Sequence, residues 1–82
     1  MTSIEIKEAI KEILIKVLKH NNFVLEDKLT AADVDGWDSL SHMMIISEIE
    51  NKFGIRFKLK ELNKMNNIGD LIELVGIKIE QK

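Results

Sequence analysis

Apolar residues in this chain recur every three or four positions, and this spacing constrains the fold more than any other feature of the sequence. Lys and Glu fill the opposite face of the first such segment, and Thr2 with Glu5 has the spacing of a capping box. The pattern predicts an amphipathic helix over residues 2–19 whose apolar stripe belongs to the core, although a partner-binding stripe is the alternative. The stripe consists of Ile6, Ala9, Ile10, Ile13, Leu14, Val17 and Leu18.

Two more helices are predicted. One begins at Asp38 or Ser39, because Asp is a good N-cap, and runs to about Lys52, before Gly54. Its apolar face is assigned to Leu40, Ile45, Ile49 and Phe53, with Met43, Met44 and Ile46 beside it. The last helix begins after Asn67 and has Asp70 in its first turn. Its apolar residues are Leu71, Ile72, Leu74, Val75 and Ile79.

The segments between these helices have other patterns. Residues 20–37 lack helical spacing and are rich in Asn, Asp and other turn-forming residues, so we predict a long loop. Loops of this length are commonly functional. Residues 55–58 alternate apolar and basic and are interpreted as an extended connector, and residues 59–65 are expected to hold one or two helical turns. Apolar residues in the long loop indicate that it packs on the bundle: Phe23, Val24, Leu25, Leu29 and Val34.

These elements predict an all-α fold, a four-helix bundle of three main helices plus one short helix. The absence of proline agrees with this prediction, and 82 residues suffice for a single domain spanning residues 1–82. The core is expected to include Ile13, Ile45, Ile49, Phe53, Leu71 and Val75.

Composition argues against several classes of function. The chain has no Cys, and its two histidines, His20 and His42, lie far apart in the sequence, so we expect no metal site. A net charge of -2 argues against a nucleic-acid binder. No apolar run approaches the ~20 residues of a membrane span, and no signal peptide is expected. These features predict a cytoplasmic protein with no membrane insertion. We also expect a monomer.

Charge is unevenly distributed along the chain. Residues 26–50 carry seven acidic residues and one Lys, whereas residues 51–64 carry four Lys, one Arg and one Glu. The acidic segment coincides with the long loop and the second predicted helix. It is interpreted either as a solvated face or as a docking surface for basic partners.

Ser39 is the residue on which the functional interpretation depends. It follows Gly36, Trp37 and Asp38 at the junction of a long loop and a helix N-terminus. Backbone N–H groups and the positive end of the helix dipole favour a phosphate ester at such a position. From these properties alone, a serine there is either an attachment point for a phosphodiester or simply a cap.

The sequence around Ser39 resembles the acyl carrier protein family. The resemblance rests on Asp38-Ser39-Leu40, on the helix end at residues 49–55 and on residues 67–75. In that family the serine carries 4′-phosphopantetheine, so the resemblance implies that Ser39 is the attachment point. It also implies that Asp38 helps a phosphopantetheinyl transferase and its metal ion to engage the site. The protein would then be a carrier and not an enzyme.

The same resemblance implies partners that exchange the cargo. These are an acyl-loading ligase or acyltransferase and a ketosynthase or other acyl-transferring enzyme. Where many fatty-acid carriers have several Glu residues along the second helix, this chain has Met43, Met44 and Ser47. A dedicated pathway for a polyketide, peptide or lipid-linked sugar therefore fits as well as fatty-acid synthesis, and the cargo is left open between acyl, aminoacyl or peptidyl, and ketide groups. The docking residues are predicted to be Asp38, Leu40, Met43, Met44, Ser47 and Glu50.

The residues of the chain suggest three alternative functions. A serine hydrolase would use Ser39 with His42 one helical turn later and Asp38 adjacent, but a domain of this size offers no water-excluding pocket. A helical interaction module without a prosthetic group would use the Met residues as an adaptable binding face. A DNA reader is supported only by the basic residues 52–64, next to an acidic segment that repels phosphate.

Overall fold

The computed structural model describes residues 2–81, which form four α-helices and one short 3-10 helix. The helices are α1 (Ser3–Leu18), α2 (Ser39–Phe53), α3 (Leu59–Leu62) and α4 (Ile68–Glu80), and the 3-10 helix η1 (Ala31–Asp33) lies in the α1–α2 loop. Residues 2–81 contain no strand, so the predicted all-α class is confirmed. None of the helices in this range is both long and apolar enough to cross a membrane.

The helix ends follow the local signals in the sequence. At the start of α1, the Glu5 N–H donates to Thr2 Oγ1 (3.2 Å) and the Thr2 N–H donates to Glu5 Oε1 (3.0 Å), which is the predicted capping box. At the end of α2, Gly54 adopts a left-handed conformation with φ of 65°. Asn67 caps α4 by accepting the Asp70 N–H on its side-chain oxygen (2.9 Å). Because these signals act within one turn, they could be predicted from the sequence.

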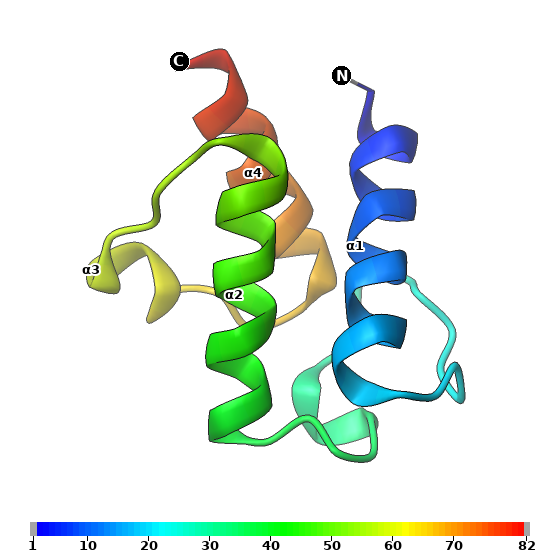
Figure 1. The fold of residues 1–82 in the computed structure, drawn as a ribbon. Helices are drawn as coiled ribbons and strands as arrows, with labels where there is room; N and C mark the ends of the chain where they lie inside the picture. Colours follow the sequence, from blue (N-terminus) through cyan, green and yellow to red (C-terminus); the bar gives the residue numbers. More distant parts are fainter. Residues whose placement is uncertain (1, 82) are drawn as a thin grey trace.

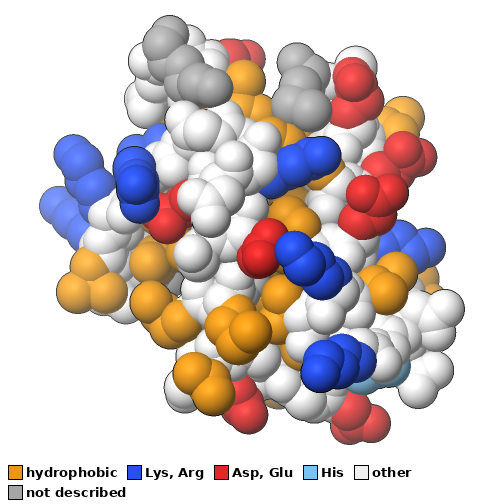
Figure 2. All heavy atoms as spheres, in the orientation of Figure 1, with side chains coloured by type: hydrophobic (Ala, Val, Ile, Leu, Met, Phe, Trp, Pro, Cys, Tyr) orange, Lys and Arg blue, Asp and Glu red, His pale blue; other side chains and the backbone are white. Residues whose placement is uncertain are grey.

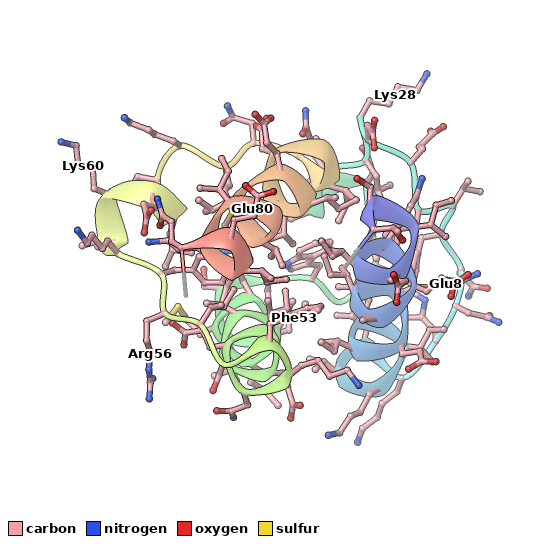
Figure 3. All side chains as sticks on the ribbon, turned by 90° about the horizontal axis from the view of Figure 1, so that it is seen from above. Glu8, Lys28, Phe53, Arg56, Lys60 and Glu80 are labelled. Atoms are coloured by element: carbon pink, nitrogen blue, oxygen red, sulfur yellow. The ribbon has the colours of Figure 1, made fainter. Side chains whose placement is uncertain are left out.

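Three long helices enclose the core. Helices α1 and α2 lie side by side with α4 packed behind them, while the single-turn α3 lies outside α2 (Figure 1). All six residues predicted for the core are buried, which confirms that part of the prediction. Figure 3 shows Phe53 directed into the interior, whereas Arg56 and Lys60 point away from the bundle. The other buried apolar residues are Ile6, Ala9, Ile10, Leu14, Leu29, Val34, Ile46, Ile55 and Ile68.

Two predictions about apolar residues are wrong. Leu40 was assigned to the buried face of the second helix, but its side chain is 73% exposed. At about 100° per residue, Leu40 lies roughly 140° around the helix from Ile45, and so it faces solvent. Val24 was expected to pack on the bundle with the rest of its loop but is also exposed, although Leu29 and Val34 in the same loop are buried.

The α1–α2 loop also contains η1, which was not predicted. The Thr30 N–H and the Thr30 hydroxyl both donate to Asp33 Oδ2, at 3.1 and 2.9 Å, and these bonds close the short turn. This loop then meets the start of α4, because the Ile68 N–H donates to the Leu29 carbonyl (2.9 Å) and the Gly69 N–H to the Asp27 carbonyl (2.8 Å). Two segments that are distant in the sequence are thus joined backbone to backbone.

Gly69→Ala is expected to destabilise the protein by about 1–3 kcal/mol. A Cβ atom at Gly69 would lie 3.0 Å from Asp27 Cβ and 3.2 Å from the Asp27 carbonyl oxygen, so the loop would have to move and weaken its hydrogen bonds to α4. Urea unfolding followed by circular dichroism measures the change. Gly76→Ala is the matched control in the same helix: its Cβ would meet only Ile6 Cδ1 at 3.9 Å, and alanine favours the helix. Equal destabilisation by both variants would contradict the close-contact argument.

Candidate functional site

The candidate site lies at the N-terminus of α2, at the opposite end of the bundle from the two ends of the chain (Figure 1). A tight turn brings the chain to this point: the Trp37 N–H donates to the Val34 carbonyl (3.3 Å) and the Asp38 N–H to the Gly36 carbonyl (3.1 Å). Gly36 has a φ of 83°, a conformation in which a side chain is strained, and so the turn requires glycine there.

Asp38 closes the first turn of α2 together with Ser41. Asp38 Oδ1 accepts the Ser41 N–H (2.9 Å), and Ser41 Oγ accepts the Asp38 N–H (2.8 Å). The hydrogen bond from the Ser41 backbone, followed by that from its side chain, lowers the pKa of Asp38 below its ordinary value. The carboxylate is therefore ionised at neutral pH and held in a defined position beside Ser39.

The two serines at this helix start have different environments. Ser41 Oγ also donates to the Gly36 carbonyl (2.8 Å), so its hydroxyl is engaged in holding the turn. Ser39 is exposed, and its hydroxyl has no hydrogen-bond partner among residues 2–81. Ser41 is therefore the structural serine, whereas Ser39 offers a free hydroxyl to solvent.

His42 is paired with Trp37 rather than with Ser39. The Trp37 Nε1–H donates to His42 Nδ1 (3.1 Å), and the two rings stack with their centroids 6.1 Å apart. Burial lowers the pKa of His42. Because the Asp38 carboxylate is bonded to Ser41, the three side chains of the hydrolase alternative do not form a hydrogen-bonded triad in the described chain.

The stability of the protein is expected to fall as the pH drops below about 6.5, the ordinary pKa of histidine. The pKa of His42 is lowered in the folded state, so the unfolded chain binds a proton more readily and acid favours unfolding. Protonation at Nδ1 would also break the bond from Trp37. Urea midpoints at pH 7 and pH 5.5 should differ less in His42→Phe than in the wild type. The same difference in both proteins would show that other groups cause the acid sensitivity.

The predicted docking residues mostly lie on one exposed strip. Leu40, Met43 and Met44 are 73%, 59% and 50% exposed, and Asp38 and Ser47 are exposed as well. Figure 2 shows hydrophobic side chains gathered over the first half of α2 and beside α3, with Lys and Arg side chains over the α2–α3 connector. Leu59 of α3, which the sequence analysis did not include among the docking residues, is 74% exposed.

Glu50 has a different position from the rest of the predicted docking set. Its side chain is 17% exposed and its Oε2 accepts the Phe57 N–H (2.9 Å), while its Oε1 lies 4.0 Å from Arg56 Nη1. These contacts hold the connector against α2. The Glu50 carboxylate is therefore engaged within the fold.

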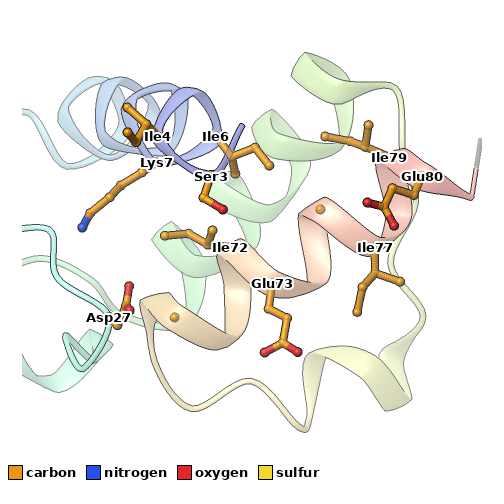
Figure 4. A pocket seen from close by; sticks show the side chains of 12 residues that line it. Ser3, Ile4, Ile6, Lys7, Asp27, Ile72, Glu73, Ile77, Ile79 and Glu80 are labelled. Carbon is orange, nitrogen blue, oxygen red and sulfur yellow. The ribbon is translucent and has the colours of Figure 1, made fainter. Parts of the chain in front are cut away.

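Two pockets differ in their position relative to Ser39: one lies near the start of α2, and the other lies away from it. A small apolar pocket of about 60 Å³ lies beside the Trp37–His42 pair, lined also by Leu29, Ala31, Met65, Asn66, Asn67, Ile68 and Leu71. A pocket of about 600 Å³ lies between α1 and α4, and Figure 4 shows Ile4 and Lys7 on one side of it and Ile72 and Ile77 on the other. None of its lining residues belongs to α2. Sequence analysis missed the smaller pocket, and Trp37 directly before the Asp38-Ser39-Leu40 motif was its only signal.

No group of three or more His, Cys, Asp or Glu side chains among residues 2–81 is arranged to hold a metal ion.

Comparison with known proteins assigns the site to a family. A family model described as a phosphopantetheine attachment site matches residues 8–75. The acyl carrier protein of Chloroherpeton thalassium is 31% identical over 75 residues, covering 92% of this chain and 94% of that protein. An acyl carrier protein homolog of Ureaplasma parvum is 37% identical over 65 residues, covering 77% and 84%. The solution structure of holo acyl carrier protein from Geobacter metallireducens has a TM-score of 0.84 and 40% identity, covering 90% of this chain and 85% of that one.

A helical bundle that presents a free serine within a phosphopantetheine attachment region defines a carrier-type domain. The chain belongs to the acyl carrier protein family. The fold predicted from the sequence is confirmed, and 4′-phosphopantetheine, the cofactor predicted from it, is the group that the matching family model describes. The site fits such a group, because the Ser39 hydroxyl is accessible and the N-terminal end of the α2 dipole favours an anionic ester.

Proposed function

We propose that this protein carries acyl or related groups on a 4′-phosphopantetheine arm attached to Ser39 Oγ. The observation that carries the proposal is the exposed, unengaged hydroxyl of Ser39 directly after the Asp38 cap, inside the region that matches the attachment-site family. The arm supplies a terminal thiol that holds cargo as a thioester, which the chain cannot do with its own side chains because it has no Cys. The role of the protein is to carry and present cargo, not to catalyse.

The residues of the chain prepare the attachment reaction. Asp38 and Ser41 fix the start of α2, so that Ser39 is held in place for a transferase that brings the arm from coenzyme A. The Asp38 carboxylate is ionised and exposed, and in this proposal it engages the transferase and the metal ion of that enzyme. The positive end of the α2 dipole stabilises the phosphodiester after transfer.

The test is the intact mass of the purified chain after incubation with coenzyme A and a broad-specificity phosphopantetheinyl transferase. The expected result is a mass increase of one 4′-phosphopantetheinyl group. A protein that stays at its original mass, while a known carrier in the same tube is loaded, would contradict the proposal.

The partners proposed for the loaded protein are an acyl-loading ligase or acyltransferase and a ketosynthase or other acyl-transferring enzyme. We place the protein in the cytoplasm as a monomer, where coenzyme A is available. The pathway is fatty-acid synthesis or a dedicated route, and an aminoacyl or peptidyl cargo is the alternative. The exposed apolar side chains of Leu40, Met43 and Met44 on α2 support the dedicated route, because enzymes that bind them need apolar surfaces of their own.

Met44→Glu is expected to lower turnover by the cognate acyl-transferring enzymes several-fold, mainly through a higher KM. Met44 is 50% exposed beside Met43, and a charge there would have to be desolvated when an apolar partner surface covers it. Loading at Ser39 should fall less, and stability should change little because the side chain is on the surface.

Asn51→Glu is the control, since it adds the same charge to an exposed position later in α2. Because the proposed contact is apolar, the wild-type KM should depend only weakly on salt. If Met44→Glu and Asn51→Glu have equal turnover, the docking face lies elsewhere, and the acidic segment 26–38 is the next surface to test.

A helical interaction module without a prosthetic group is the second candidate, favoured by the exposure of Leu40, Met43 and Met44. Such a module would keep its partner binding in Ser39→Ala. A carrier would lose its function in that variant, so the two candidates are separable.

A further inference from the structure

The Trp37–His42 pair fixes which nitrogen of His42 carries a proton. The indole Nε1–H can only donate, and it donates to His42 Nδ1 at 3.1 Å. Nδ1 must therefore be unprotonated, and in the neutral ring Nε2 carries the hydrogen. Within residues 2–81, no acceptor is bonded to this Nε2–H. His42 thus offers one oriented hydrogen-bond donor that the fold does not use.

The surroundings of His42 favour this neutral form. The imidazole lines the small pocket of about 60 Å³ together with apolar and amide side chains, and none of the pocket-lining residues is charged. Burial accordingly lowers the pKa of His42. Asp38, the N-cap of the same helix, directs its carboxylate to the Ser41 N–H. The donor at Nε2 is therefore present at neutral pH without help from a neighbouring carboxylate.

His42 lies about one helical turn after Ser39, the proposed attachment residue. Ser39 and His42 both lie in α2 and are separated by three positions, a spacing that places side chains on the same helix face with Cβ atoms about 5–6 Å apart. A phosphodiester on Ser39 would have its phosphorus bonded directly to Oγ, so its oxygens could not move far from this face. Of all parts of a prosthetic arm, the phosphate alone is confined in this way.

We propose that His42 is a binding residue for the prosthetic arm, with its Nε2–H donating to a phosphodiester oxygen on Ser39, and that Trp37 is the positioning residue that orients the ring. The inference rests on the proposed function. The acceptor is anionic, so the hydrogen bond is of the stronger, charge-assisted kind. The Trp37 Nε1–H donates to Nδ1, the other nitrogen of the ring, and so fixes the tautomer and the orientation of the imidazole. A hydrogen bond to the second ring nitrogen has the same effect on a histidine that binds a metal ion.

The test compares the apo protein with the loaded protein, after intact mass has established complete loading. Nuclear magnetic resonance follows the ring protons of both histidines against pH. The titration midpoint of His42 is expected to move to higher pH by about half a unit or more on loading, because a nearby negative charge favours the imidazolium form. His20 is the internal control, since its ring is bonded to the Asp35 carbonyl (2.6 Å) and the Asn22 N–H (3.0 Å) in the α1–α2 loop. The ring-proton resonances of His20 at pH 7 should be the same in the apo and the loaded protein.

A second measurement distinguishes direct contact from a general field effect. The phosphorus resonance of the loaded protein should titrate with the same midpoint as His42, and this titration should disappear in His42→Phe. In Trp37→Phe the ring loses its orienting donor, and the shift of the His42 midpoint should be at least halved.

An unchanged His42 midpoint in the fully loaded protein, or a phosphorus titration that persists in His42→Phe, would overturn the inference while leaving the carrier function standing. A chain that cannot be loaded contradicts the proposed function and removes the inference with it.

Discussion

Ser39→Ala is expected to abolish the mass increase that transferase and coenzyme A produce in the wild-type protein. The variant lacks the Ser39 hydroxyl, which is exposed and has no hydrogen bond within the described chain, so no phosphodiester can form there. The chain has four serines, and at this helix start Ser41 is held by three hydrogen bonds. Loss of loading should be complete, because alanine removes the acceptor atom rather than weakening its reactivity.

The fold of Ser39→Ala should be unaffected, since the Ser39 hydroxyl has no hydrogen bond within the described chain and alanine is a good helix former. Its unfolding midpoint therefore serves as an internal check. Ser47→Ala is the matched control: Ser47 is also an exposed serine of α2, two turns further along, and this variant should load at the wild-type rate. A mass increase that survives Ser39→Ala would move the attachment point to another residue.

Ile49→Ala is expected to lower the free energy of unfolding by about 2–5 kcal/mol. Ile49 has no exposed surface and lies in α2 at the centre of the core. Truncation removes three methyl or methylene groups from contact with neighbours that can only partly close the cavity. For a domain of this size the total is about 4–12 kcal/mol, so the variant would keep only part of its stability.

Urea unfolding followed by circular dichroism gives the change in free energy, and the slope of the transition reports whether the variant still unfolds in one step. Ile4→Ala makes the same chemical change at an exposed position in α1 and should cost about 0.5 kcal/mol or less. If the two variants are equally stable, the assignment of Ile49 to the core is wrong.

Features that depend on near neighbours could be predicted from the sequence. The helix starts at Thr2, Asp38 and Asn67 rest on side chains that bond to backbone groups three residues away. The apolar stripes repeat with the period of the helix, so the buried residues of α1 and, in α4, Leu71 and Val75 were also assigned correctly, whereas the buried Ile68 at the start of α4 was not. The position of Ser39 directly after the Asp38 cap is also set by neighbouring residues. The resemblance of this motif to acyl carrier proteins led to the correct family.

Features that depend on contacts between distant segments required the tertiary structure. Whether a loop residue packs inward depends on what lies beneath it, and for this reason Val24 is exposed while Leu29 in the same loop is buried. The Glu50 side chain is engaged because the chain returns to it at Phe57. Gly69 is needed because the Asp27 carbonyl lies against it from a segment 42 residues earlier.

The features of the candidate site fall into the same two groups, those set by neighbouring residues and those set by tertiary contacts. The sequence by itself determined the helix start, the aspartate cap and the serine that follows it, because these are set within one turn of backbone. Only the tertiary structure decided that Ser41 is engaged while Ser39 is free, and that the Trp37 indole holds His42 beside a small apolar pocket. These arrangements arise when the α1–α2 loop folds against α2 and the start of α4. Side-chain directions in such a loop follow from packing, which the pattern of residue types does not encode locally.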